Sequence, residues 1–414
     1  MSKAQISCFI MDKQSQTKLW SADFIVVAAI NLLVLVSYYM LLVTIGNYVV
    51  DTFDASKSVA GLVTGTMVIG CLVGRFITGF FLEMIGCKKV LFVGIIGFII
   101  TMALYLTAFN LSSLIFIRFI SGIFVGVIGT VTGTILVYIV PPNRRGEGIS
   151  YFSLSTILAT ALGPFAGMLL VQYVHFNILF YFSVVIGAIC LLIALQLQAN
   201  KLVINKPQTH TNQNKVAWLQ LSSYIEPSAL RISFIVMLVS VGYAAIQAYL
   251  SFYAQELGLI EAASFFFAIY AIFILISRPF SGRLFDLKGE NVIIYPTLFL
   301  LSIGFMVLSI ANNALVLLLS SALIGLGFGN FQSTAQAVAV KVSPHHKVGQ
   351  ATSTYFILFD FGIGLGPYFM GQLIPYTGYH GLYLVCALIS LLSMILYFFL
   401  HGRQKPAISV MKER

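Results

Sequence analysis

The chain has 414 residues, of which 59% are hydrophobic and only 9% are charged. A soluble domain carries roughly 25% charged residues, so a water-soluble fold is excluded because it could not hide this much apolar surface. The net charge of +10 comes from basic residues in short clusters between apolar runs, which is typical of membrane topology and not of a nucleic-acid-binding module. The composition therefore indicates a polytopic α-helical membrane protein.

Apolar runs long enough to cross a hydrocarbon core of ~30 Å recur along the whole length. They predict about twelve transmembrane helices, six in each half of the chain. The predicted spans are 22–46, 57–85, 89–109, 112–139, 148–174, 177–198, 230–255, 261–286, 291–311, 314–341, 350–376 and 379–400.

A polar stretch separates the two halves and predicts a flexible linker. The expected organisation is a six-helix half over 1–198, a cytoplasmic linker over 199–228 and a second six-helix half over 229–414. The last part of the linker, Val216 to Ile225, is amphipathic and suits the membrane interface.

The charges of the loops alternate along the chain. Lysines precede the first span and follow the second at Lys88 and Lys89, whereas Asp51 and Asp54 lie in the loop between these spans. Lys and Arg are retained on the cytoplasmic side, so both termini are predicted to be cytoplasmic and the location to be the plasma membrane. The first span lacks the cleavage site of a removable signal peptide and is expected to stay.

The second half repeats the first at a constant offset of 203 positions. The stretch RFITGFFLEMIGCKK after the second predicted helix is spelled again as RPFSGRLFDLKGEN. The paired positions are Arg75/Arg278, Gly79/Gly282, Glu83/Asp286, Gly86/Gly289, Asn110/Asn313, Gly122/Gly325, Gly126/Gly329, Pro141/Pro344, Gly146/Gly349, Ser150/Ser353, Gly163/Gly366 and Pro164/Pro367. An ungapped register of this length indicates duplicated halves.

No cofactor or metal is expected. The five Cys are scattered without paired spacing, and the six His form no ligand cluster, His345 and His346 lying in a loop. The chain contains no phosphate-binding loop of the GxxxxGK[ST] type, which argues against an ATP-driven pump.

Six plus six helices, a central linker and a Gly/acid/Gly/basic loop after the second helix of each half resemble the major facilitator superfamily of secondary transporters. That family's loop reads approximately G-x-L-x-D-x-x-G-R-K. The first half keeps Gly79, Glu83, Gly86 and Lys88 but has Cys87 at the first basic position, and the second half, with Gly282, Arg283, Asp286 and Gly289, is nearer to the motif. The resemblance implies a charged latch at the cytoplasmic seam, with simple anchoring charges as the alternative.

Two further motifs resemble the proton-coupled exporters of the family. Arg118, followed by Gly122 and Gly126 in the fourth predicted helix, is similar to the R-x-x-x-G motif of proton-coupled members. The Gly163–Pro164 pair in the fifth helix looks like the Gly-Pro motif of antiporters, and Gly366–Pro367 repeats it in the eleventh. Gly-Pro frees a backbone carbonyl and lets the helix bend, which would serve an importer as well.

The second half resembles one branch most closely. The segments FYAQELG (252–258), SRPFSGRLFD (277–286) and DFGIG (360–364) look like the subgroup that holds uncharacterised bacterial drug exporters and the exporters of staphylopine-type opine metallophores. This resemblance implies a metallophore or an amphipathic drug as substrate.

Few acids fall within the predicted spans. Asp360 lies close to the middle of the eleventh helix, whereas Asp23 lies at the start of the first. A carboxyl group in a low dielectric can bind and release a proton, so Asp360 is the preferred coupling residue, with Arg118 as a fixed positive charge and Asp23 next. A permanent structural salt bridge of Asp360 is the alternative.

Polar residues at helical spacing on helices that line the central cavity in this family are candidate substrate contacts. They are Asn31, Tyr38, Tyr243, Gln247, Gln332 and Gln336, with Arg118 as a holder of carboxylates. Each of them also suits a hydrogen bond between helices.

The sequence therefore predicts a monomeric major facilitator fold that is not an enzyme and that exports small organic molecules in exchange for protons. A sugar or carboxylate importer, or a receptor or scaffold that no longer transports, are the alternatives.

Overall fold

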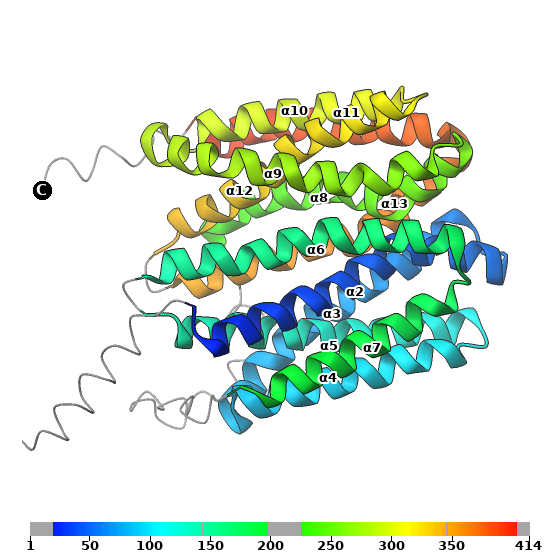
Figure 1. The fold of residues 1–414 in the computed structure, drawn as a ribbon. Coiled ribbons are helices and arrows are strands. Elements are labelled where there is room, and N and C mark those ends of the chain that lie inside the picture. Colours follow the sequence, from blue (N-terminus) through cyan, green and yellow to red (C-terminus); the bar gives the residue numbers. More distant parts are fainter. Residues whose placement is uncertain (1–19, 142–143, 198–224, 345–346, 404–414) are drawn as a thin grey trace, which may run out of the picture. The chain divides into compact units, whose positions relative to one another are not determined.

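A computed structural model describes residues 20–141, 144–197, 225–344 and 347–403. Every regular element in this described part is helical (Figure 1). The helices are α2 (Ala22–Phe53), α3 (Lys57–Ile85), α4 (Cys87–Leu104), η1 (Tyr105–Thr107), α5 (Leu111–Ile139), α6 (Arg145–Tyr173), α7 (Asn177–Leu195), α8 (Pro227–Glu256), α9 (Ile260–Lys288), α10 (Asn291–Ser309), α11 (Ala314–Ile324), η6 (Gly325–Gly329), α12 (Asn330–Lys341), α13 (Val348–Tyr397) and η8 (Phe398–Gly402). The predicted linker falls almost wholly outside the described residues.

Eleven stretches of helix in the described part are long and apolar enough to cross a membrane. The last of them, α13 with η8, has 55 residues and would be about 80 Å long if straight, far more than a membrane requires. Gly378 interrupts it with φ 64° and ψ −176°. Each side of this break is long enough to cross once, so the described part contains twelve helical stretches of membrane-spanning length, in agreement with the prediction of about twelve.

Contacts along α8 show that α13 folds back at Gly378. Near its start, Thr354 accepts a hydrogen bond from the backbone N–H of Glu226, which caps the first turn of α8. Gly378 lies beside Glu256, at the last turn of α8. The chain then returns, because His401 of η8 shares a pocket with the first residue of α8.

The duplicated register has a counterpart in local structure. Asn110 caps α5 with φ −146° and ψ 164°, and Asn313 caps α11 with φ −148° and ψ 165°. Each side chain accepts a hydrogen bond from the backbone N–H three residues on, at 2.8 Å from Ser113 and 3.0 Å from Val316. Both asparagines therefore satisfy an amide that a helix start would otherwise leave without a partner.

The glycines that end the repeated loop motif also match. Gly86 and Gly289 have φ values of 83° and 82°, in the left-handed region that side chains with a Cβ avoid. Helices α3 and α9 end immediately before these glycines, so the chain must adopt the left-handed conformation at both positions, and glycine does this without strain. The chain can then turn at once into the next helix.

We expect Gly289→Ala to destabilise the protein by about 1–2 kcal/mol, because alanine pays for the left-handed conformation that glycine adopts freely. Thermal unfolding of the purified protein in detergent measures this. Gly349→Ala is the matched control, since Gly349 has no left-handed backbone and its added Cβ meets nothing within 4 Å. Equal midpoints for the two variants would contradict the expectation.

Residue contacts divide the chain into two compact units. The first comprises Met1–Leu41, Gly70–Gly163 and Val174–Lys206, and the second Leu42–Ile69, Pro164–Tyr173 and Pro207–Arg414. Helices α2, α3 and α6 contribute residues to both units. In the first, α4 packs against α5 and α7, and in the second, α13 packs against α8 and α10.

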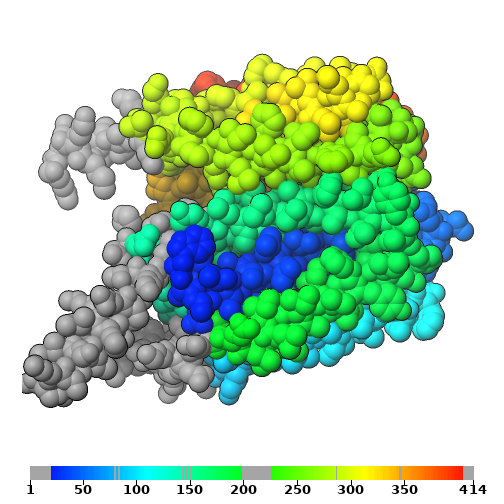
Figure 2. All heavy atoms as spheres, in the orientation of Figure 1, coloured from blue at the N-terminus to red at the C-terminus, as the bar shows by residue number. Residues whose placement is uncertain are grey.

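Apolar side chains cover much of the surface. In the second unit, α9 and α11, which lie at the surface in Figure 2 (yellow-green and yellow), carry large exposed apolar residues: Phe265, Ile272, Phe273, Ile276, Phe280, Leu315 and Leu319. Such a surface is stable against hydrocarbon and not against water. The structure therefore agrees with the membrane-spanning class that the composition indicated.

Candidate functional site

A chain of aromatic rings crosses the second unit between α8 and α13, and we call it the aromatic cluster: Tyr243, Tyr270, Phe328, Phe359 and Tyr355. Tyr243 stacks on Phe328 and Tyr270, with ring centroids 4.0 and 5.6 Å apart. Phe359 lies 6.5 Å from Phe328 and stacks on Tyr355 at 6.2 Å. Four helices of the second unit thus meet in one aromatic surface.

Polar groups are attached to one end of this cluster. The Tyr243 hydroxyl is hydrogen-bonded to Tyr270 and to Gln247 one turn along α8. Gln247 is buried, and its Oε1 has no hydrogen-bond partner among the described residues. A buried amide oxygen with no partner is costly, so a ligand that donates a hydrogen bond would be favoured at this point. Two of the predicted contacts, Tyr243 and Gln247, therefore lie together.

Asp360 is attached to the other end. It lies in α13, is 3% exposed and interacts electrostatically with Tyr355. Tyr355 in turn donates a hydrogen bond of 2.8 Å to the backbone carbonyl of Gln332 in α12. The buried acid is thus joined through one tyrosine to the helix that carries Gln332 and the half-buried Gln336.

The helix that presents Phe328 is not a regular α-helix. Residues Gly325–Gly329 form a π-helical segment, η6, between α11 and α12. Asn330 follows it and donates hydrogen bonds to Ser277 Oγ at 2.8 Å and to the Leu326 carbonyl, while its Oδ1 accepts from Ser281 Oγ at 2.8 Å. π-Segments are frequent at functional sites, and here one asparagine fixes the segment to α9.

Arg118 lies in the first unit, in α5, and is fully buried. Its guanidinium is hydrogen-bonded to the Tyr105 hydroxyl, which also pairs with Ser121 at 2.8 Å. Around it α5 lies very close to α3, because a Cβ on Gly126 would collide with the Cys71 carbonyl. The predicted deep arginine is present, and its role toward a substrate stays a prediction.

The remaining candidates of the first unit make local contacts. Asn31 donates hydrogen bonds to Ser155 Oγ at 2.8 Å and Thr156 Oγ1 at 3.3 Å in α6, which is the helix-to-helix use that any of these residues could have. Tyr38 is buried and packs edge-on against the next tyrosine ring. Asp23 lies in the first turn of α2, where a carboxylate suits the helix N-terminus.

Both Gly-Pro pairs lie at close helix crossings. A Cβ on Gly163 would press on the backbone of α2 at Val36 and Met40. A Cβ on Gly366 would press on Val241 of α8, and the neighbouring Pro367 carbonyl accepts a hydrogen bond of 2.5 Å from Tyr249. The glycines thus permit close packing, as predicted from the motif.

A contact that sequence reasoning missed joins α3 to α13 within the second unit, and we call it the glycine seam: Gly61, Gly65, Gly364 and Gly371. A Cβ on Gly65 would collide with the Gly364 carbonyl, and a Cβ on Gly61 with the Pro367 carbonyl. The Tyr249 hydroxyl bridges the two helices, because it lies 3.1 Å from the Lys57 carbonyl as well as 2.5 Å from that of Pro367. The i, i+4 spacing of Gly61 and Gly65 was the available signal.

Lys57 strengthens the same contact. It is the first residue of α3, where a positive charge is unfavourable because it lies at the positive end of the helix dipole. Its Nζ lies 3.7 Å from the centre of the Phe252 ring and is attracted by Glu256 and Asp51. A cation over an aromatic face is stabilised by about 0.5–2 kcal/mol, so the charge is compensated from α8.

The repeated loop motifs lie at the ends of α3 and α9. The surroundings of Gly79 and the side chains of Glu83 and Asp286 lie outside the described part, so a charged latch that includes these residues stays a prediction. Arg283 is exposed and Arg278 is half-buried, where it interacts electrostatically with Tyr270.

The predicted motif residue Lys88 has a local partner. It donates a hydrogen bond of 2.8 Å to the Leu197 carbonyl just beyond α7. A lysine is stabilising at that helix end, because its charge opposes the negative end of the helix dipole.

Two buried acids hold the loops at the start of α8 and of α10. Glu290 accepts from Lys341 Nζ at 2.8 Å and lies 3.4 Å from His401 Nε2. The contact with His401, opposed by burial and aided by Lys341, lowers the pKa of Glu290 to about 2. At the other acid, the hydroxyl of Ser228 and then Lys347, 3.1 Å away, lower the pKa of Glu226.

We expect Glu290→Gln to lower stability at neutral pH by about 1–3 kcal/mol, the usual range for a hydrogen bond to a charged group. The folded-state pKa of Glu290 lies below its ordinary value of 4.5, so its contribution is complete above pH 4.5 and disappears as the pH falls toward about 2. Unfolding midpoints of wild type and variant should therefore converge over that range. Glu261→Gln, at an exposed acid in α9, is the control; a constant gap at all pH values would contradict the prediction.

Known proteins agree with this architecture. The model described as Major Facilitator Superfamily matches residues 27–367 and, in a second match, 262–413. An uncharacterised MFS-type transporter of Methanocaldococcus jannaschii is 25% identical over 350 residues, covering 84% of this chain and 90% of that protein. The staphylopine export protein of Staphylococcus aureus is 24% identical over 365 residues, covering 86% and 90%. Multidrug resistance protein 3 of Bacillus subtilis is 32% identical over 146 residues, which is 35% of this chain and 28% of that protein.

Solved structures show the same fold. A POT peptide transporter in complex with sulfate superimposes with a TM-score of 0.79 at 14% identity, covering 97% of this chain and 98% of that one. The nucleoside transporter NupG gives 0.75 at 15% identity, covering 92% and 100%. The family and these neighbours are membrane transporters and not enzymes, as the sequence predicted. With its family model matched along nearly its whole length, the chain belongs to the Major Facilitator Superfamily.

Proposed function

We propose that this transporter exports a small zwitterionic or anionic organic molecule in exchange for protons. The observation that carries the proposal is the nearly complete burial of Asp360 at one end of the aromatic cluster. An acid within a membrane helix is costly and is usually retained for function. Asp360 interacts electrostatically with Tyr355, which is hydrogen-bonded to α12, the helix that carries Gln332 and Gln336. Binding or release of a proton by Asp360 can therefore change the position of the predicted substrate contacts.

The substrate class follows from the polar groups and from the relatives. Within the second unit, Gln247 offers an unused amide oxygen and the aromatic cluster offers flat apolar surface. A molecule with an N–H donor and an apolar part fits these two, and the role of the buried Arg118 of the first unit as a holder of carboxylates stays a prediction. An amino-acid-derived metallophore has such groups, and relatives named for staphylopine export and multidrug resistance support it, with amphipathic drugs next.

The exchange requires that proton and substrate alternate. With Asp360 ionised, its negative charge attracts the positively charged amine of the substrate. When Asp360 gains a proton, that attraction is lost and the substrate leaves. The loop that carries Asp54 alternates with the lysine-rich cytoplasmic loops and is therefore expected on the outer side, and Gly61 of the glycine seam follows it closely in α3. We assign the glycine seam as the contact that opens to release substrate. The remaining assignments are cytoplasmic termini, a plasma-membrane location and a monomer.

Proteoliposomes with an imposed proton gradient test the proposal. An exporter moves substrate only when the gradient is present, and collapse of the gradient with an ionophore stops it. Counterflow that ignores the gradient would instead identify a facilitator or importer, and absence of movement for every compound would indicate a receptor. A comparison of metabolites in the medium of cells with and without the gene supplies the compounds to test.

A further inference from the structure

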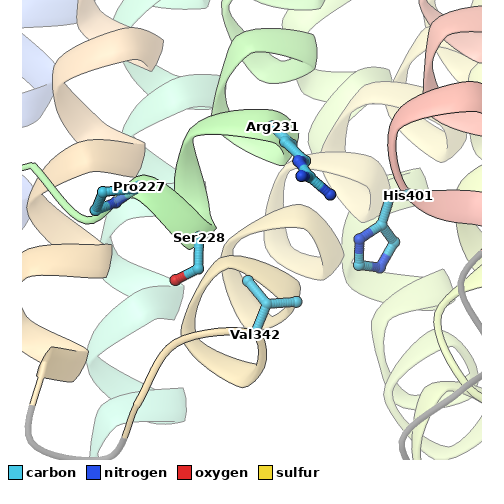
Figure 3. Close-up of a pocket in the computed structure, with 5 residues that line it drawn as sticks. All are labelled: Pro227, Ser228, Arg231, Val342 and His401. Carbon is cyan, nitrogen blue, oxygen red and sulfur yellow. The ribbon is translucent and has the colours of Figure 1, made fainter.

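A second pocket, remote from the aromatic cluster, lies where α8 begins. Its volume is about 350 Å³, and it is lined by Pro227, Ser228 and Arg231 of α8, Val342 after α12 and His401 of η8. In Figure 3 the guanidinium of Arg231 and the ring of His401 point toward one another across it. None of these five described residues is an acid. Two basic groups thus line the pocket without a carboxylate among its described lining residues.

The two acids near the pocket already have basic partners. Glu290 pairs with Lys341 and faces Nε2 of His401, and Glu226 pairs with Lys347. Arg231 is exposed and makes no hydrogen bond or ion pair with the described residues. Lys341 and Lys347 thus each pair with a carboxylate, whereas Arg231, which lines the pocket, pairs with none among the described residues.

His401 supplies the second binding group. It is only 8% exposed, and its Nε2 side is used by Glu290, whereas its Nδ1 makes no hydrogen bond with the described residues. A neutral ring that donates from Nε2 has a lone pair at Nδ1, so only the protonated ring donates from both nitrogens. An anion in the pocket would therefore accept from Nδ1 while Glu290 accepts from Nε2.

We propose that this pocket binds a phosphate group, which accepts hydrogen bonds from Arg231 and from protonated His401. Basic pockets between helix ends are typical binding places for anionic headgroups, and Arg is well suited to phosphate because its fork donates two parallel hydrogen bonds. Leu230 and Phe234 flank Arg231 on α8, and both are exposed. Their apolar surface suits the acyl chains of a lipid, and a soluble phosphate offers the same binding group without them.

Binding to the full-length protein in a non-ionic detergent tests the site. The probes are inorganic phosphate and short-chain phosphatidylglycerol, each titrated while thermal stability is followed. We expect Arg231→Gln to weaken binding by at least about tenfold, the value of one strong charge-assisted hydrogen bond. Val342→Phe fills the pocket without changing charge and should weaken it as well. A response to the lipid alone identifies a membrane source, and a response to phosphate alone a soluble one.

The matched control is Arg403→Gln. Arg403 lies at the same end of the protein but stacks on Phe398 and Phe399, with its guanidinium carbon 4.7 and 5.1 Å from the ring centres, and does not line the pocket. Equal loss in this variant, or no loss in Arg231→Gln, overturns the site, as does the absence of a response to both probes.

His401→Ala gives an independent readout. The variant should bind both probes more weakly, because the ring that donates to the phosphate is removed. Unchanged binding would remove His401 from the site. Neither result depends on transport, so the test is separate from that of export.

Discussion

Asp360→Asn is expected to reduce proton-driven export to background while substrate still binds, more weakly, through Gln247 and the aromatic cluster. Asparagine keeps the shape of aspartate but cannot carry a proton between the two sides, so the step that links substrate release to proton entry is lost. Proteoliposomes loaded with substrate and given a proton gradient measure export. Substrate binding to the same purified variant in detergent, followed by a shift in thermal stability, measures the part that should remain.

Glu261→Gln is the matched control, since it makes the same chemical change at an exposed acid in α9 and should export normally. An Asp360→Asn protein that still concentrates substrate against the proton gradient would place coupling at another residue. Asp23 in the first turn of α2 would then be examined next. Loss of both binding and export would favour the alternative in which Asp360 is a structural partner.

Gly65→Ala is expected to slow transport by at least about tenfold, because the new Cβ would collide with the backbone carbonyl of Gly364 and α3 could not close on α13. A cysteine in place of Ser58, on the same helix, reports the opening. Ser58 Oγ donates to the Tyr368 carbonyl at 3.3 Å when the seam is closed. A membrane-impermeant thiol reagent should label this cysteine faster in the Gly65→Ala background.

Gly133→Ala is the matched control, because it also adds one methyl group to a helical glycine but meets nothing within 4 Å. It should transport and label like the parent protein. Gly→Ala within a helix usually favours the helix by roughly 0.5–1 kcal/mol, but the collision at Gly65 can offset this, so the rates of the two variants are compared at equal amounts of folded protein. Normal transport with unchanged labelling in Gly65→Ala would show that the seam does not need to close.

The helices were predictable because each depends on a local property, a run of apolar residues of membrane length. The prediction of 57–85 coincides with α3, and that of 314–341 with α11, η6 and α12 together. It failed at helix ends that no local signal marks. Helix α2 continues to Phe53, past the predicted end at 46, because Asn47 and Asp51 are tolerated inside it. The π-segment η6 could not be predicted either, because it depends on the hydrogen bonds of Asn330 with Ser277 and Ser281 in α9.

The site was predictable only in part, for the same physical reason. Asp360 stood out because a charge within an apolar run is conspicuous by itself. The glycine seam joins residues some three hundred positions apart, and one sequence does not show which glycine meets which. Asn31 fitted the pattern of a cavity residue, but whether its amide meets a ligand or Ser155 is decided by the packing of α6.

Tyr249 has one hydroxyl proton and two carbonyls within reach, from Lys57 and Pro367. Both carbonyls belong to helices and have a second lone pair, so each also accepts its own intrahelical hydrogen bond. If α3 moves away, the proton stays with Pro367 and the Tyr249 hydroxyl keeps a partner. Separation then costs dispersion contacts, the attraction of Lys57 to α8 and the long hydrogen bond of the half-buried Ser58, without an unmade hydrogen bond at the buried Tyr249. Closed and open forms can therefore be close in free energy, and a modest difference in how they bind a substrate is enough to change which one predominates.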